Sequence, residues 1–343
     1  MNPDRTPAPR PTLPESGPVR IYEVSPRDGL QNEAEVVGTS EKLGLIRRLL
    51  AAGVSDIEVT SFVRPSWIPQ LADAAELVTA LPSLSRDFPD ARFWALVPNR
   101  RGLERALDGQ VRHICTFMSS SETHNKKNVN RTRAESLGAL REVISIARDE
   151  GIGVRAYLST VFGCPYEGPV AIDETRRLAQ ELLAAGADEV ALGDTTGMGS
   201  PRLVFEVLTA LVDDGVPLDR IALHMHDTRG TALANVLAGW QFGVRTFDGS
   251  VGGLGGCPYA PGAAGNAASD DLVQFFESMG SETGIDLDRL AHAGHFLAGV
   301  LGRPLPGRFH QFHRANLPPA PVDGNRDGDA GAACADPGAR NSA

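Results

Sequence analysis

The sequence predicts an α/β fold, a closed (β/α)8 barrel of the TIM type with extra C-terminal helices. Between residues 19 and 305, short β-rich runs alternate regularly with helical patterns, and this alternation favours a parallel sheet. About eight such units follow one another in about 250 residues, the usual size of a closed barrel. An open doubly wound sheet fits less well, because no strand is left over as an unpaired edge.

Eight β-rich runs are predicted as the barrel strands, and seven helical patterns lie between them. Ser200 and Pro201 are typical of a helix start, and Gly53 and Gly151 are typical of helix ends. The strands are expected at Val19–Ser25, Asp56–Ser61, Arg92–Val97, Val111–Phe117, Gly153–Val161, Glu189–Leu192, Ile221–His226 and Val244–Val251. The helices are expected at Lys42–Ala51, Leu71–Leu81, Arg101–Leu107, Ala134–Glu150, Ala171–Ala185, Pro201–Val212 and Ala232–Phe242. Residues 255–272 and the helices beyond them are expected to follow the eighth strand and cover one end or the rim of the barrel.

Both ends of the chain are predicted to be tails outside the barrel. Residues 1–18 contain six prolines, and residues beyond about 315 are rich in Pro, Ala, Gly, Asp and Asn, so neither stretch buries much apolar surface. We therefore expect a disordered Pro-rich tail at 1–18, one catalytic domain with C-terminal helices at 19–305, and a disordered tail at 306–343.

The charge balance and composition narrow the classes of partner. The chain has 33 Lys and Arg against 43 Asp and Glu, a formal net charge of −10, and so lacks the basic field of most nucleic-acid binders. No apolar run reaches the roughly 20 residues that a membrane span requires, and no apolar signal core follows the N-terminus. We expect a cytoplasmic protein with four reduced cysteines and with neither a nucleic acid nor a membrane as partner.

Three segments at the ends of predicted strands carry residues that are able to hold a metal ion. In this barrel class the active site forms at the C-terminal ends of the strands, and closure places the eighth strand between the seventh and the first. Asp28 follows the first strand, His224 and His226 end the seventh, and Asn266 lies in the loop after the eighth. The two histidines are two residues apart, so both imidazoles project to the same face. The sequence therefore predicts one cation site at this rim.

The predicted site combines two nitrogen donors with several oxygen donors. This set favours Mg²⁺ or Mn²⁺, although two histidines and a carboxylate also suit Fe(II) or catalytic Zn²⁺. Taken singly, the Asp-Gly pair is typical of a turn and the His-x-His of a solvated or hydrogen-bonded pair. The position of all three motifs at one end of neighbouring strands favours the metal site.

Further candidates lie on or just beyond the predicted strands. Cys257 lies in a loop with seven glycines between residues 249 and 265, flexible enough to open and close, although a lone cysteine is more often a packed small residue. Strand residues whose alternative role is packing or a hydrogen bond inside the barrel are Glu58, Arg155, Tyr157 and Asp194. A basic run, either a solvated loop or the patch that a phosphorylated cofactor requires, contains Lys126, Lys127 and Arg131.

Seven longer motifs extend the comparison beyond single residues. They are Ser25–Glu33 (SPRDGLQNE), Thr60–Val63 (TSFV), Lys126–Asn130 (KKNVN), Gly163–Gly168 (GCPYEG), Leu192–Thr195 (LGDT), His224–Thr228 (HMHDT) and Gly253–Ala260 (GLGGCPYA). With these motifs the chain resembles the hydroxymethylglutaryl-CoA lyases, a metallolyase branch of the TIM barrels. The resemblance extends from about Val19 to Leu301, nearly everything except the tails.

The resemblance implies an activity, a set of metal ligands and a role for Arg27. The activity is metal-assisted retro-Claisen cleavage of 3-hydroxy-3-methylglutaryl-CoA to acetyl-CoA and acetoacetate, so we expect an acyl-CoA substrate and also a homodimer. The implied metal ligands are Asp28, His224, His226 and Asn266. By the resemblance Arg27 is catalytic and Cys257 lies on a mobile active-site loop. From their positions and chemistry we further expect catalytic roles for Asp28, Glu58, His224 and Cys257. The expected substrate-binding residues are Arg27, Gln31, Lys126, Arg155, Tyr157 and Asp194.

Two negative charges develop in turn during this reaction, on the alkoxide and then on the thioester enolate. We expect Arg27 to meet the enolate oxygen with fixed donors. We expect Cys257 to deliver a proton to the departing enolate. The group that deprotonates the hydroxyl stays open.

Several positions depart from the animal enzymes of this family. Ala34 stands where those carry a lysine, Ala191 replaces a serine and Asp270 replaces a glutamate, but no predicted ligand is lost. A lyase for a longer 3-hydroxy-3-alkylglutaryl-CoA therefore stays open. One alternative function is a condensing enzyme like 2-isopropylmalate or homocitrate synthase, which usually carries a long C-terminal regulatory region. Another is a catalytically silent barrel that binds an acyl-CoA or a metal, which has no need of all these residues.

Overall fold

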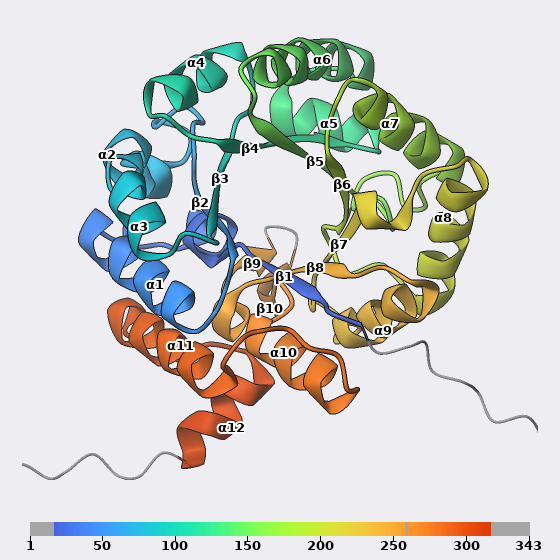
Figure 1. The fold of residues 1–343 in the computed structure, drawn as a ribbon. Helices are drawn as coiled ribbons and strands as arrows, with labels where there is room; N and C mark the ends of the chain where they lie inside the picture. Colours follow the sequence, from blue (N-terminus) through green and yellow to red (C-terminus); the bar gives the residue numbers. More distant parts are fainter. Residues whose placement is uncertain (1–16, 258–259, 317–343) are drawn as a thin grey trace, which may run out of the picture.

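The computed structural model describes residues 17–257 and 260–316. They form a closed barrel of eight parallel strands in sequence order, with helices around it (Figure 1). The predicted fold class is confirmed. The barrel strands are β1 (Arg20–Glu23), β2 (Asp56–Ser61), β3 (Arg92–Leu96), β4 (His113–Ser119), β5 (Gly153–Ser159), β6 (Glu189–Asp194), β7 (Ile221–Met225) and β8 (Thr246–Gly249). A small antiparallel hairpin follows, made of β9 (Gly256–Cys257) and β10 (Ala260–Ala264).

Helices cover the outside of the barrel (Figure 1). The first six are α1 (Thr39–Ala51), α2 (Ala74–Val78), α3 (Leu81–Asp87), α4 (Arg100–Asp108), α5 (Glu122–Val129) and α6 (Arg133–Asp149). The others in the described part are α7 (Ile172–Ala184), α8 (Pro201–Asp213), α9 (Ala232–Phe242), α10 (Ser269–Ser278), α11 (Leu287–Leu301) and α12 (Arg308–Asn316). None of these helices is long and apolar enough to cross a membrane.

Two stretches differ from the sequence prediction for local reasons. The single helix predicted at Leu71–Leu81 is replaced by α2 and α3, and Pro82 lies in the first turn of α3, where its missing N–H would have no helical partner. Helix α5 lies where the sequence allowed a solvated loop around Lys126. Ser121 caps it by accepting a hydrogen bond from the backbone N–H of His124 (3.1 Å). Its sequence is too polar to show a periodic apolar face, so the pattern did not predict it.

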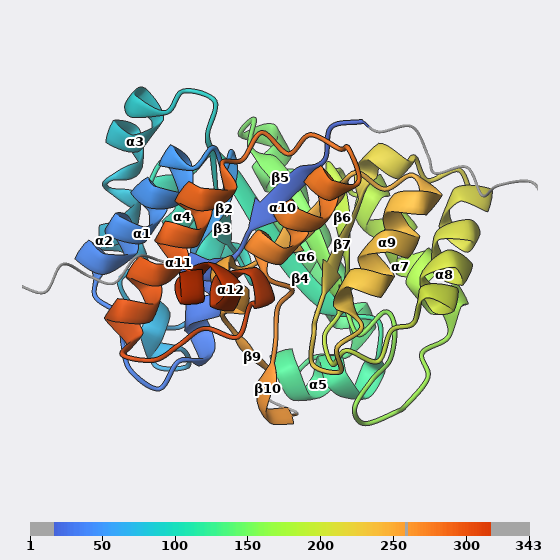
Figure 2. The same ribbon diagram turned by 90° about the horizontal axis from the view of Figure 1, so that it is seen from below.

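The three C-terminal helices pack beside one another on the outside of the barrel (Figure 2). Helix α11 lies against α1, and α12 lies against α10 and α11. Helix α12 falls inside the stretch predicted as a disordered tail from residue 306. The Asp271 carboxylate accepts hydrogen bonds from the backbone N–H groups of Arg308 and Phe309 (3.0 and 2.6 Å), and His310 is fully buried. Ordered structure therefore extends to Asn316; the rest of the predicted tail lies outside the described residues.

Two different environments flank the barrel strands. The outer faces pack with the helices into a large apolar core, whereas the inner faces carry a small apolar cluster that includes Tyr22 and Tyr157. Buried charges occupy the rest of the lumen: Arg155 donates to Glu189 Oε1 (2.7 Å) and to Asp248 Oδ1 (2.6 Å). Buried ions are tolerated when they are paired and hydrogen-bonded. The ion pairs therefore fix the directions of the inward side chains.

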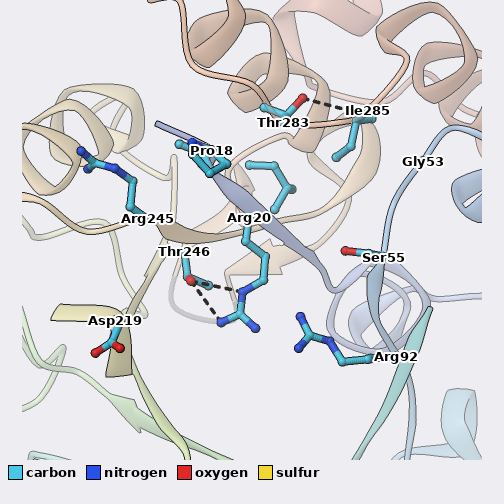
Figure 3. Close-up of a pocket in the computed structure, with 12 residues that line it drawn as sticks. Pro18, Arg20, Gly53, Ser55, Arg92, Asp219, Arg245, Thr246, Thr283 and Ile285 are labelled. Atoms are coloured by element: carbon cyan, nitrogen blue, oxygen red, sulfur yellow. Dashed lines mark hydrogen bonds between the residues drawn. The ribbon is translucent and has the colours of Figure 1, made fainter. Parts of the chain in front are cut away.

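A cavity of about 570 Å³ lies at the N-terminal end of the strands (Figure 3). Arg20 at the start of β1 donates from Nε and Nη2 to Thr246 Oγ1 (3.2 and 3.0 Å). Arg92 Nη2 donates to Asp56 Oδ2 (2.7 Å). These pairings close this end of the lumen, and no predicted site residue lines the cavity.

Candidate active site

The three predicted segments meet at the C-terminal end of the barrel. Strand β8 pairs with β1 on one side and with β7 on the other, so segments from opposite ends of the sequence become neighbours. After β1 the chain makes one π-helical turn, Ser25–Gly29, which carries Arg27 and Asp28. A Cβ on Gly29 would lie 2.8 Å from Ser250 Oγ. Glycine therefore lets this turn approach the loop after β8.

Four potential ligands form one cluster at this rim. The ligand atoms of Asp28, His224 and His226 lie within 4.8 Å of one another. Nε2 of His224 is 3.2 Å from Nε2 of His226. Asn266 Nδ2 donates to Asp28 Oδ2 at 2.9 Å, and Asn266 reaches this place because its backbone pairs with that of His226 in a short antiparallel bridge.

The donor atoms of the cluster fit a divalent cation. Oδ1 of Asn266 is buried and has no hydrogen-bond partner within the described part of the chain. Burial and the neighbouring His224 lower the pKa of His226 to about 3, so its ring is neutral. Burial opposes ionisation of Asp28, but Arg27 and then His224 outweigh it and lower the pKa of Asp28 to about 2. A neutral imidazole and an ionised carboxylate are the forms that bind metals.

Asp248 on β8 holds the ring of His224. The two residues are register partners, and His224 Nδ1 lies 2.9 Å from Asp248 Oδ2. Burial raises the pKa of Asp248, but Arg155 outweighs burial and lowers it below the usual range. The carboxylate is therefore ionised, His224 carries its hydrogen on Nδ1, and Nε2 is left to face His226. Sequence reasoning missed this residue, although a carboxylate inside a predicted strand was a usable signal.

Arg27 is held between two carboxylates. Its Nε and Nη2 donate to Glu58 (2.7 and 3.1 Å), and its Nη1 donates to Asp28 Oδ1 (2.5 Å). Gln31 Nε2 also donates to Asp28 Oδ1 (2.7 Å). Burial opposes the charge, but Glu58 and then Asp28 raise the pKa of Arg27 well above its usual range. The guanidinium is therefore a fixed positive charge beside the four potential ligands.

Hydrogen bonds join the residues around the cluster into a continuous chain. Tyr157 OH donates to Glu58 Oε2 (2.7 Å) and accepts from Arg155 Nη1 (2.9 Å). The complete chain consists of Asp28, Arg27, Glu58, Tyr157, Arg155, Asp248 and His224. Arg155 is fully buried and lies two residues before Tyr157 on β5, deeper in the lumen. From this place Arg155 holds Tyr157 and Asp248, and its predicted contact with substrate stays a prediction.

The family of the chain follows from a family model described as HMGL-like, which matches residues 18–297. The chain belongs to this family. The hydroxymethylglutaryl-CoA lyase YngG from Bacillus subtilis is 47% identical over 304 residues, which cover 89% of this chain and 100% of that protein. The cytoplasmic 3-hydroxy-3-methylglutaryl-CoA lyase from Mus musculus is 43% identical over 293 residues, covering 85% of this chain and 83% of that protein.

Solved structures agree with the family assignment. An HMG-CoA lyase from Acinetobacter baumannii, solved in complex with coenzyme A and 3-methylmalate, has a TM-score of 0.80 and 36% identity, covering 89% of this chain and 98% of that one. The resemblance indicated by the motifs is therefore confirmed. These relatives do not favour the alternative of a condensing synthase.

The remaining predicted site residues of this HMGL-like barrel lie on β6, α5 and β9. Asp194 ends β6 and accepts hydrogen bonds from two backbone N–H groups of the following turn (2.9 and 3.1 Å); burial raises its pKa to about 6. Lys126 is exposed on α5, 3.5 Å from Glu122 Oε1. Cys257 ends β9, but its side chain lies outside what the structure describes.

A second cavity, of about 650 Å³, adjoins the lumen of the HMGL-like barrel at the same end. The chain after β2, the start of α4 and the end of α5 line it, and Phe117 of β4 connects it to the inner apolar cluster. Four of its lining residues are basic and none is acidic. The basic residues are Arg64, Arg101, Arg105 and Arg131.

Asp248→Asn is expected to weaken divalent-metal binding about 10- to 100-fold, the usual effect of losing a carboxylate behind a metal-ligating histidine. The asparagine keeps the size of the side chain but no longer selects the Nδ1–H form of His224. Calorimetric titration of metal-free protein with Mn²⁺ measures the change. Asp56→Asn is the matched control, because Asp56 is a buried lumen carboxylate paired with Arg92 at the other end of the barrel. Equal losses of affinity in both variants would mean that the effect is one of folding.

Proposed function

We propose that the protein cleaves 3-hydroxy-3-methylglutaryl-CoA to acetyl-CoA and acetoacetate. The observation that carries this proposal is the convergence of Asp28, His224 and His226 beside the fixed charge of Arg27. Curated relatives at 43% and 47% identity carry this substrate in their names. We propose Mg²⁺ or Mn²⁺ as the cation, because Asp28 and Asn266 would add oxygen donors to the two imidazoles.

The proposed cleavage places negative charge on two oxygen atoms in turn. A general base takes the proton of the C3 hydroxyl, and the C3–O bond becomes the ketone of acetoacetate as the C2–C3 bond breaks. The electron pair of the broken bond moves onto the thioester as an enolate. Asp28, His224, His226 and Asn266 would hold the cation, which would supply Lewis acidity at the hydroxyl when bound. Arg27 donates to the enolate oxygen from a position that its two carboxylate partners fix, an oxyanion-hole role.

The enolate must then be protonated at C2 to give acetyl-CoA. Cys257 is the proposed donor, and the β9–β10 hairpin that carries it projects from the C-terminal end of the barrel (Figure 2). Gly255, before this hairpin, has a φ of 127°, and a Cβ there would lie 2.6 Å from Asn266 Nδ2. Glycine at position 255 therefore lets the backbone pass close to the side chain of Asn266. Both oxygens of Glu58 already accept hydrogen bonds, from Arg27 and Tyr157, so we assign Glu58 to positioning Arg27.

The CoA part of the substrate is proposed to occupy the arginine-lined cavity. A chain with a net charge of −10 needs local positive groups to bind phosphates. Four arginines line this cavity, and Lys126 and Lys127 lie on α5, whose end forms part of its wall. The thioester at the end of the pantetheine arm then points into the lumen, toward Arg27.

Arg101→Ala and Arg131→Ala are each expected to raise KM for the acyl-CoA about tenfold, since a hydrogen bond to a charged group is worth about 1.5–3 kcal/mol and exposure reduces that value. The value of kcat is expected to change little, because neither residue is near the reacting carbons. Steady-state kinetics measure both constants. Arg202→Ala, on the exposed face of α8, is the control. An unchanged KM in both cavity variants would show that the phosphates bind elsewhere.

A direct assay tests the proposed activity. Purified protein loaded with Mg²⁺ or Mn²⁺ is expected to release acetyl-CoA and acetoacetate from the methyl substrate, and a series of longer 3-alkyl substituents measures the width of the site. Folded, metal-loaded protein that forms no acetyl-CoA from the methyl substrate would overturn the assignment.

A homodimer and a cytoplasmic location belong to the same proposal. The relative from Mus musculus carries the cytoplasmic location in its name. Light scattering of the purified protein measures the oligomeric state, and fractionation of the source cells measures the location.

A further inference from the structure

Four of the eight histidines of the chain lie together on the two C-terminal helices, away from the cluster at the barrel rim. Each helix contributes two, three residues apart, so the pair on each helix shares one face. The ring of His295 lies 4.4 Å from that of His310 and 5.2 Å from that of His313, measured between ring centres. The ring of His292 lies 5.2 Å from that of His313. Four imidazoles thus line the contact between α11 and α12.

His295 and His313 have the same kinds of neighbours as His224 at the barrel rim. Nε2 of His295 lies 2.9 Å from Nδ1 of His313, and the other nitrogen of His313 lies 3.6 Å from Asp288 Oδ1. At the rim, Nε2 of His224 faces a second imidazole nitrogen and its Nδ1 faces a carboxylate. A carboxylate behind a histidine orients the ring and makes the facing nitrogen a better metal ligand.

The ring nitrogens of His310 are a second, independent observation that indicates a bound ion. Its side chain is fully buried, and neither ring nitrogen has a hydrogen-bond partner among residues 17–257 and 260–316. Buried polar atoms in folded proteins are almost always satisfied by protein, water or an ion. The unsatisfied ring lies directly against His295.

We propose that this histidine cluster is a second metal site, which takes a borderline transition-metal ion such as Zn²⁺. Zn²⁺ bonds imidazole nitrogen at about 2.0–2.1 Å, so two nitrogens of a tetrahedral site lie about 3.3 Å apart, close to the distance between His295 and His313. Among the described residues, three ligand atoms lie within 4.8 Å of one another only in the cluster of Asp28, His224 and His226 at the barrel rim. The third nitrogen of the helical site comes from rotation of the His310 ring or of the exposed His292 ring.

The ligand chemistry separates the two sites. Imidazoles without oxygen donors suit Zn²⁺, Ni²⁺ or Cu²⁺ and bind Mg²⁺ poorly, whereas the rim cluster offers Asp28 and Asn266. An ion at the helical site fastens α12 to α11. Both helices pack against residues 251–253, the start of the loop that leads to Asn266, and Gly307 N donates to Gly252 O (2.7 Å). An ion between α11 and α12 would therefore stabilise the start of that loop through the two helices, at a distance from the substrate.

Zinc counting on the tag-free, full-length chain tests the proposal. After metal removal and Zn²⁺ titration in excess Mg²⁺, the variant Asp28→Asn/His226→Ala is expected to retain about one equivalent with all-nitrogen coordination, as X-ray absorption reads it. His295→Asn/His313→Asn is expected to lose that equivalent and the accompanying rise in melting temperature. His113→Asn, a histidine at the start of β4, is the matched control.

Two results would overturn the proposal. The first is a rim variant, folded by circular dichroism, that holds no Zn²⁺, since the helical cluster is intact there and His295 and His313 would then share only a hydrogen bond. The second is an unchanged zinc count after replacement of both histidines. If the double variant does not fold, the rim variant alone decides, because it leaves all four histidines in place.

Discussion

Arg27→Gln is expected to lower kcat for cleavage of the methyl substrate about 10³-fold, the upper range for losing one oxyanion donor. The guanidinium is buried, and two carboxylates fix its orientation, so it needs no reorganisation when charge develops on the enolate oxygen. Glutamine keeps a neutral donor but not the positive charge. Pre-steady-state measurement of acetyl-CoA formation gives the chemical step directly, and KM is expected to change much less than kcat.

The metal content of the variant separates a catalytic from a structural role of Arg27. Calorimetric titration with Mn²⁺ is expected to give the same stoichiometry as the parent chain, because Asp28 keeps Gln31 and Asn266 as hydrogen-bond donors. Arg27→Lys is the matched variant: it keeps the charge but loses the paired contact with Glu58, so an intermediate rate is expected. Loss of the metal together with the activity would mean that Arg27 only holds the ligand cluster.

The neighbourhood of the active site could be predicted from the sequence because a closed parallel barrel places all strand ends on one face. Asp28 and Asn266 follow β1 and β8, and His224 lies near the end of β7. Closure makes these three strands adjacent, so recognising the strands was sufficient to bring the residues together. The spacing of His224 and His226 fixed their common direction, since side chains alternate along a strand. Such inferences need the order of the strands but not the side-chain contacts.

Contacts that depend on register or on distant partners were not predictable in the same way. Asp248 meets His224 because of the offset between β7 and β8, which no local pattern encodes. The depth of Arg155 in the lumen follows from its partners Glu189 and Asp248, which lie on other strands. Helix α12 depends on a cap from Asp271, far earlier in the chain. Sequence patterns describe single elements, whereas these features arise between elements.

His226→Ala is expected to reduce activity about 10³-fold at a fixed, limiting concentration of Mn²⁺, since Lewis-acid stabilisation is worth several kcal/mol and each 1.4 kcal/mol is a factor of ten. His226 offers a neutral, buried nitrogen 3.2 Å from its counterpart on His224, and alanine leaves a single imidazole in the set.

Excess Mn²⁺ distinguishes weaker binding from a defect in the chemistry. If His226 serves only to hold the ion, saturating Mn²⁺ restores most of kcat, and only the apparent dissociation constant for Mn²⁺ is raised. His113→Ala, which removes an imidazole that packs against Trp94 at the start of β4, controls for general loss of stability and is expected to leave both constants unchanged. An unaltered metal constant in His226→Ala would exclude His226 from the ligand set, and the ion would then have to be held by Asp28, His224 and Asn266 alone.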